Sequence, residues 1–171
     1  MANCQLYKYN QSTYFIKKES SNYFANNFSE KEIDSEYTSW LNFHGLNEIE
    51  NIELLCQHLE IDHLCVESIF TETRRAKVEE YDKYMFFSIK SALPSDNEEQ
   101  FLISEQITFV LSHDYLISFQ EKVSDYFTKI RDRITNDKGV IRKKSTDFLL
   151  FRMLEAIIDN YFDVIETINE K

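Results

Sequence analysis

Apolar and polar positions in the first 43 residues predict three β-strands, and the alternation is clearest at residues 37–43. Apolar and aromatic residues on both sides of a polar segment at residues 10–12 predict two strands joined by a short turn. Residues 20–35, rich in Ser, Asn and acids, predict a helix or an irregular link. Residues 37–43 predict another strand, which His44 and Gly45 end. The chain is therefore expected to begin as a small sheet.

Two helices are expected to follow this sheet. From Asn47 to Leu59 the apolar residues recur at steps of three and four, which is the spacing of an amphipathic helix. Asn47 is the predicted N-cap of this helix. A shorter helix is predicted over residues 62–70, with Asp62 as its cap.

Strand-forming residues return in the middle of the chain. Residues 78–93 and 101–112 are rich in Phe, Tyr, Ile and Val, and a polar loop at residues 94–99 separates them. These segments predict a β-hairpin. The next two residues form a predicted tight turn into a third neighbouring strand at residues 115–120.

Helical spacing dominates the remainder of the chain. Four apolar residues form one stripe of a predicted helix that residues 137–139 end. This stripe consists of Val123, Phe127, Ile130 and Ile134. From about Ser145 a longer helix is predicted, and six of its apolar residues form a coiled-coil-like seam. The seam consists of Phe151, Leu154, Ile158, Tyr161, Ile165 and Ile168. No Gly or Pro interrupts this helix before Lys171, so we expect it to continue into further sequence.

Charge and composition narrow the classes of partner. The formal net charge of −11 makes nucleic acid and anionic lipid poor partners, because both are polyanions. The one basic run, residues 142–144, is interpreted as a solvated turn. Three cysteines and the absence of a signal segment indicate an intracellular protein. The apolar runs are far shorter than the roughly 18 residues that cross a bilayer.

Two groups of side chains could bind metal ions. Five acids stack on one face of the last predicted helix, either as a simple solvated face or as a surface that Mg²⁺ or Ca²⁺ neutralises. These acids are Glu155, Asp159, Asp163, Glu166 and Glu170. Four potential zinc ligands also lie within ten residues, but their spacing fits no usual zinc motif, so buried Cys and surface His are favoured. They are Cys56, His58, His63 and Cys65.

Signatures of enzymes are mostly excluded. Gly45 and Gly139 are the only glycines, so neither a phosphate-binding loop nor a dinucleotide fingerprint can be written. Cys65 as a nucleophile with a distant His is a remote alternative to an ordinary core cysteine. The chain is expected not to be an enzyme.

Several segments from about Trp40 onward resemble, in content and order, the cytoplasmic domain of CorA magnesium transporters. They are IDHLCVESI (61–69), RAKVEEY (75–81), SEQITFVL (104–111), LISFQE (116–121), GVIRKK (139–144), DFLL (147–150) and AIIDNYF (156–162). The resemblance implies an α/β fold, an α/β/α sandwich with a mixed central sheet. It places the cytoplasmic domain at residues 1–144. It also implies that residues 145–171 begin a long stalk helix, which is cut before the transmembrane region.

The same resemblance implies a regulatory metal site between subunits. In this family a homopentamer surrounds a pore, and magnesium bound between neighbouring cytoplasmic domains holds the closed state. The positions of the intersubunit site are held here by Glu67, Ser68 and Glu155. Ser68 is a hydroxyl where the family has a carboxylate, so the site carries one negative charge fewer. Cobalt, nickel and zinc are alternative divalent ions for it.

Two other functions stay open at the level of sequence. One is the related zinc-transporting branch of the family, which shares the fold. The other is a stand-alone protein that uses its long helix to bind a partner. In the leading hypothesis the parent protein is integral to the cell membrane, with this domain on the cytoplasmic face.

Overall fold

The computed structural model describes residues 3–29, 33–73, 75–94, 102–121 and 126–169. In these ranges one seven-stranded sheet has the order β2-β1-β3-β7-β6-β5-β4. The strands are β1 (Asn3–Tyr9), β2 (Tyr14–Glu19), β3 (Thr38–His44), β4 (Lys77–Glu80), β5 (Met85–Pro94), β6 (Leu102–Leu111) and β7 (Tyr115–Gln120). β3 and β7 are parallel and every other neighbouring pair is antiparallel, so the sheet is mixed.

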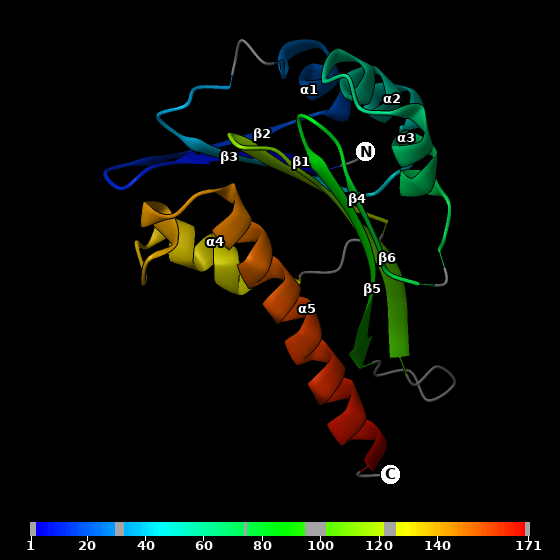
Figure 1. Cartoon of the computed structure of the whole chain (residues 1–171). Helices are drawn as coiled ribbons and strands as arrows, with labels where there is room; N and C mark the ends of the chain where they lie inside the picture. The colour runs from blue at the N-terminus through cyan, green and yellow to red at the C-terminus, as the bar shows by residue number, and fades with distance from the viewer. Residues whose placement is uncertain (1–2, 30–32, 74, 95–101, 122–125, 170–171) are drawn as a thin grey trace.

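Helices cover both faces of this sheet (Figure 1). One layer contains α1 (Ser21–Asn27), α2 (Ile49–His58) and α3 (His63–Phe70). The other contains α4 (Thr128–Thr135), the 3-10 turn η1 (Ile141–Lys143) and α5 (Thr146–Asn169). The α/β/α sandwich with a mixed central sheet is therefore confirmed.

Successive side chains of a strand point to opposite faces, and this alternation divides the core in two. On β3, Phe43 packs toward α1–α3 and Trp40 packs toward α4 and α5. We call the two clusters the first core and the second core. The first core includes Phe43, Leu55, Cys56, Cys65, Ile69 and Phe119. The second core includes Trp40, Phe109, Leu116, Leu149, Met153 and Ile157.

The predicted strand at residues 78–93 is wrong as a single element. β4 ends at Glu80 and β5 begins at Met85, with a turn between them that pairs the two strands antiparallel. In that turn the Tyr81 amide donates to the Tyr84 carbonyl over 2.9 Å, and the two rings stack with centroids 4.7 Å apart. The hairpin of β5 and β6 is confirmed. Its predicted loop beyond Pro94 lies outside the described residues.

One of the two predicted helix caps is wrong. Glu48, not Asn47, is the N-cap residue of α2, and it makes no side-chain cap bond. The Glu48 carboxylate instead accepts hydrogen bonds from Ser21 Oγ and from Asn51 Nδ2. The Asp62 cap of α3 is confirmed, because its Oδ1 accepts from the Leu64 amide over 2.9 Å.

The stripe predicted before residues 137–139 is confirmed in its second half. Ile130 and Ile134 are buried on α4, while Phe127 is the residue that precedes the helix. The helix ends at Thr135, ahead of the predicted stop. Val123 lies outside the described residues.

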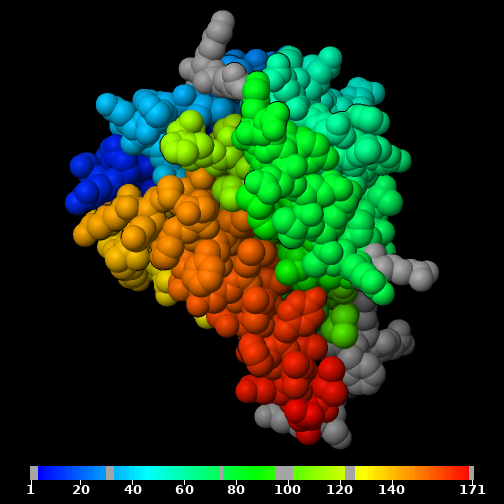
Figure 2. Space-filling view, viewed as in Figure 1, coloured from blue at the N-terminus to red at the C-terminus, as the bar shows by residue number. Residues whose placement is uncertain are grey.

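The long C-terminal helix is confirmed as α5, which begins at Thr146 and crosses the second core. Its buried apolar residues are Leu149, Leu150, Met153, Ile157 and Val164. The predicted seam lies beside this face, and five of its six residues are exposed, namely Phe151, Ile158, Tyr161, Ile165 and Ile168. Figure 2 shows the last turns of α5 projecting past the main body of the domain.

Within the described ranges, none of the helices combines the length and apolarity that a bilayer span needs. The division into a domain at residues 1–144 and the start of a stalk at residues 145–171 stays a prediction.

Candidate metal site at helix α3

Helix α3 separates its buried residues from the predicted metal ligands. Cys65 and Ile69 are four positions apart, so they share the face that packs into the first core. Glu67 lies on the outer side of the helix and is exposed, and Ser68 is half-buried at its edge. Among the ion pairs found in the described part of the chain, none involves Glu67. Its carboxylate is therefore available to a ligand.

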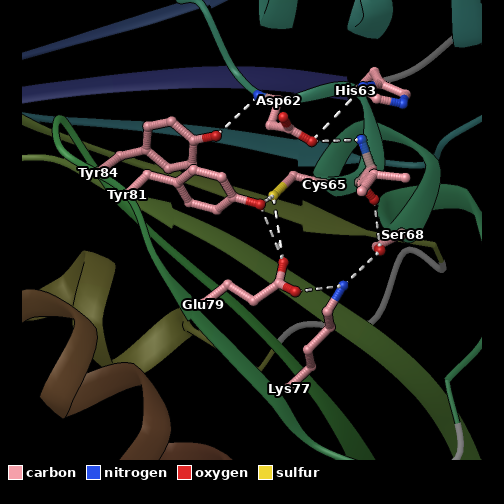
Figure 3. Close-up of polar contacts among 9 residues, drawn as sticks. Asp62, His63, Cys65, Ser68, Lys77, Glu79, Tyr81 and Tyr84 are labelled. Carbon is pink, nitrogen blue, oxygen red and sulfur yellow. Dashed lines mark hydrogen bonds and ion pairs between the residues drawn. The ribbon is translucent and has the colours of Figure 1, made fainter.

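Ser68 already has two partners. Its hydroxyl donates to the Leu64 carbonyl over 2.7 Å, and it accepts a hydrogen bond from Lys77 Nζ over 3.3 Å (Figure 3). The same ammonium group lies 3.1 Å from Glu79 Oε1. The hydroxyl that stands where the family has a carboxylate thus faces a positive charge from its own chain.

Glu79 is a carboxylate beside α3 that the sequence did not single out. Its Oε2 accepts from the Tyr81 hydroxyl over 3.3 Å and lies 3.7 Å from the Cys65 thiol (Figure 3). Burial raises the pKa of Cys65, and the hydrogen bond to Cys65 raises the pKa of Tyr81. The available signal was strand alternation, since Lys77 and Glu79 are two positions apart and share a face of β4.

Glu155 is placed away from the two residues on α3. It lies on α5 and forms an ion pair with Arg152, one turn earlier on the same helix. Because α3 and α5 cover opposite faces of the sheet, the sheet separates Glu155 from Glu67 within one copy (Figure 1). The structure brings Ser68 next to Glu67 but does not bring Glu155 to them. A site that uses all three needs two copies of the chain.

The remaining acids of α5 form an exposed row. Asp159, Asp163 and Glu166 are exposed, and Glu170 lies outside the described residues. Within those residues no three His, Cys, Asp or Glu side chains are grouped so that they could hold a metal ion. The described acids of α5 therefore form no metal site in a single copy.

The four potential zinc ligands point in different directions. Cys56 and Cys65 are buried in the first core. His58 Nδ1 lies 2.9 Å from the Ala25 carbonyl oxygen, while the His63 side chain is exposed beside Asp62. The arrangement matches buried thiols and surface imidazoles.

The basic run at residues 142–144 is not a simple solvated turn. The Arg142 side chain is only 8% exposed, and its Nε donates to the Ile134 carbonyl over 2.6 Å. Its terminal NH2 donates to the Thr135 carbonyl over 3.0 Å. Arg142 therefore satisfies the free carbonyls at the end of α4, where a positive charge is stabilised by the helix dipole. The interpretation as a solvated turn is wrong for this residue.

Comparison with known proteins agrees with this fold. Residues 35–171 match the family described as CorA-like Mg2+ transporter protein. The cobalt/magnesium transport protein CorA of Thermotoga maritima is 33% identical over 138 residues, which cover 81% of this chain and 39% of that protein. The chain thus spans about two fifths of the length of this relative.

Solved structures share the fold at low sequence identity. The soluble domain of CorA from Methanocaldococcus jannaschii superposes with a TM-score of 0.68 at 14% identity, over 96% of this chain and 60% of that one. The ZntB cytoplasmic domain from Vibrio parahaemolyticus RIMD 2210633 gives a TM-score of 0.66 at 18% identity, over 97% and 62%.

The mixed sheet between two helix layers, followed by the long α5, is the same fold as that of the solved soluble domain of CorA from Methanocaldococcus jannaschii. The chain belongs to the family of CorA-like Mg²⁺ transporter proteins.

Proposed function

We propose that this chain is the divalent-cation-sensing domain of a CorA-like magnesium transporter. In this proposal Mg²⁺ binds between neighbouring copies on the cytoplasmic face of the membrane and stabilises the closed state of a homopentamer. The ligands are Glu67 and Ser68 of one copy and Glu155 of the next. The chain itself catalyses no reaction.

The observation that supports the proposal most directly is the position of Glu67. Its carboxylate is exposed on α3, next to Ser68, and is paired with no cation among the described residues. Oxygen ligands of this kind suit Mg²⁺, which keeps several waters and takes one or two carboxylates. Because Glu155 lies across the sheet, a shared ion would join two copies and not two parts of one copy.

Electrostatic attraction explains how a bound divalent cation would hold neighbouring copies of the chain together. The chain has a formal net charge of −11, so copies brought side by side repel one another. A divalent cation between two carboxylates replaces this repulsion with attraction. An ion that binds only the assembled state shifts the population toward it, and its removal reverses the shift.

Sedimentation equilibrium of the chain with Mg²⁺ or with a chelator tests the proposal. We expect the average mass to rise with Mg²⁺, and we expect Glu67→Gln and Glu155→Gln each to remove the rise. Glu50→Gln, an exposed acid on α2, is the matched control with the same change in charge. A mass that is independent of Mg²⁺ in the wild type contradicts the proposal. A loss in Glu67→Gln alone leaves the ligand from the second copy unassigned and removes Glu155 from the site.

Zinc is the second candidate ion, because a domain described as that of ZntB has the same fold. The same sedimentation experiment with Zn²⁺ in place of Mg²⁺ separates the two ions. A response to Zn²⁺ and not to Mg²⁺ favours the zinc-transporting branch of the family.

A further inference from the structure

The ammonium group of Lys77 lies beside α3, between the Ser68 hydroxyl oxygen and a carboxylate oxygen of Glu79. Its Nζ is 3.3 Å from Ser68 Oγ and 3.1 Å from Glu79 Oε1 (Figure 3). A hydroxyl and a carboxylate oxygen are the kinds of ligand that hard divalent cations take. Lys77 therefore holds a positive charge at the position that a bound ion needs if Ser68 is its ligand.

This placement is fixed by the surrounding residues. Lys77 and Glu79 share one face of β4, and their side chains are 33% and 35% exposed. The Lys77 ammonium lies 5.8 Å from the centre of the Phe86 ring. The second oxygen of Glu79 accepts from Tyr81, so the carboxylate is held from both sides. Lys77 thus meets an anchored partner and is not a mobile surface lysine.

We infer that Lys77 is a tethered competitor of the divalent cation and sets the concentration at which the α3 site binds it. The inference rests on the proposed function and adds the residue that regulates it. Ser68 Oγ accepts a hydrogen bond from Lys77 Nζ over 3.3 Å, so a cation that binds this oxygen either displaces the ammonium or is repelled by it at close range. The site then responds at a higher cation concentration than it would without the lysine.

Glu155, the proposed ligand from the next copy, also has a positively charged neighbour. Glu155 is paired with Arg152 of its own helix, so an ion that reaches this carboxylate also meets a positive charge. Glu67 is the exception among the three proposed ligands. The inference concerns Lys77 because it contacts Ser68 from a different element of the fold.

Repulsion between the ammonium and the ion gives the size of the effect. A single and a double positive charge about 5 Å apart in water repel by an amount that corresponds to roughly a tenfold change in affinity. Lys77→Met removes the charge and keeps a long unbranched side chain at this position. We therefore expect Lys77→Met to lower the Mg²⁺ concentration at half-maximal association about tenfold. Lys77→Arg keeps the charge and is expected to stay close to the wild type.

Lys138→Met is the matched control for the change in charge. Lys138 pairs with Asp132 over 2.9 Å after α4, in the layer opposite α3. The Lys138→Met variant removes one positive charge from the chain at a position outside the proposed site. Its Mg²⁺ concentration at half-maximal association is therefore expected to equal that of the wild type. Circular dichroism of each variant checks that it is folded.

A local measurement accompanies association. Mn²⁺ as a paramagnetic probe is expected to broaden the amide signals of residues 66–69 at lower concentration in Lys77→Met than in the wild type. The same midpoint in wild type and Lys77→Met, with both responding, overturns the inference and leaves the proposed function standing. Response in Lys77→Met alone contradicts the proposed function for the wild-type chain and supports Lys77 as the group that opposes the cation. Absence of response in both overturns the proposed function and the inference with it.

Discussion

The two helix layers differ in how fully one copy of the chain covers its own apolar residues. Along α2 and α3, which the structure describes in full, the exposed large apolar side chains are Ile49 and Leu64. Along the described length of α5 there is a row of exposed large apolar side chains, consisting of Phe151, Ile158, Tyr161, Phe162, Ile165 and Ile168. A layer whose apolar residues are nearly all covered needs no partner for its stability, whereas an exposed apolar row marks a surface for association.

Truncation of buried side chains is expected to have the largest effect on the free energy of unfolding. Such variants also test whether the two cores unfold together. Leu55 of α2 and Leu149 of α5 are both fully buried, in the first and second core respectively. Leu55→Ala and Leu149→Ala are each expected to lower the free energy of unfolding by about 2–5 kcal/mol. Denaturant unfolding should show one transition in both variants, because the cores share the sheet. Two separate transitions in either variant would mean that the layers unfold independently.

Alkaline pH is expected to act on the cysteine thiols of the first core. All three cysteines lie in the first core, and burial raises the pKa of Cys4 and of Cys56 from 9.0 to about 12. A raised folded-state pKa stabilises the protonated thiol, so this stability is complete below about pH 9 and falls toward pH 12. The slope is up to about 1.4 kcal/mol per pH unit for each thiol.

Replacing one thiol isolates its contribution. Cys56→Ala is expected to make the dependence of unfolding free energy on pH shallower by about 1.4 kcal/mol per unit between pH 9 and pH 12. Met153→Ala truncates the second core without removing a titrating group, so it should lower stability and leave the slope unchanged. An unchanged slope in Cys56→Ala contradicts the assignment.

Helix capping provides a smaller and more local test. Asp62→Ala is expected to destabilise the protein by about 1 kcal/mol, because the Leu64 amide loses its acceptor. Asp62→Asn keeps a good cap and should retain most of the stability. Asn47→Ala should change the free energy of unfolding little, since Asn47 does not cap α2. If Asn47→Ala costs as much as Asp62→Ala, the description of these helix starts is wrong.

Polar substitution in the exposed row of α5 is expected to have the smallest effect on unfolding. Ile158→Ser is expected to change the free energy of unfolding by less than about 0.5 kcal/mol, because the side chain is 50% exposed. The same variant should weaken association in sedimentation if the row contacts another copy. Ile49→Ser, at an exposed position on α2, is the matched control. A loss of stability as large as that of Leu149→Ala would show that the row is covered within one chain.

Local sequence patterns were sufficient to predict an element where one residue type or one spacing is compatible with a single local structure. Asp62 was predicted to cap α3 because an acid before an apolar run satisfies free amides at a helix start, and it does so. The hairpin of β5 and β6 and the pair of β1 and β2 followed from alternating apolar residues on both sides of polar turns. The family assignment followed from segments in a fixed order, and residues 35–171 match it.

The candidate site includes contacts that local sequence patterns could not predict. Glu67 and Ser68 are neighbours in the sequence and stay so in space. Lys77 and Glu79 come from β4, and nothing in the order of residues tells that β4 passes beneath α3. Sequence could therefore name a hydroxyl at Ser68 but not the ammonium group that contacts it.

The sequence by itself determined which residues of α5 share a side, because helical spacing fixes the relative directions of side chains. It did not determine which side is buried, since α5 carries apolar residues at Leu149 and Met153 as well as along the predicted seam. Only packing against the sheet decided this, because burial depends on the shape and position of the opposing surface. The same holds for the separation of Glu67 from Glu155, which the sheet between their two layers imposes.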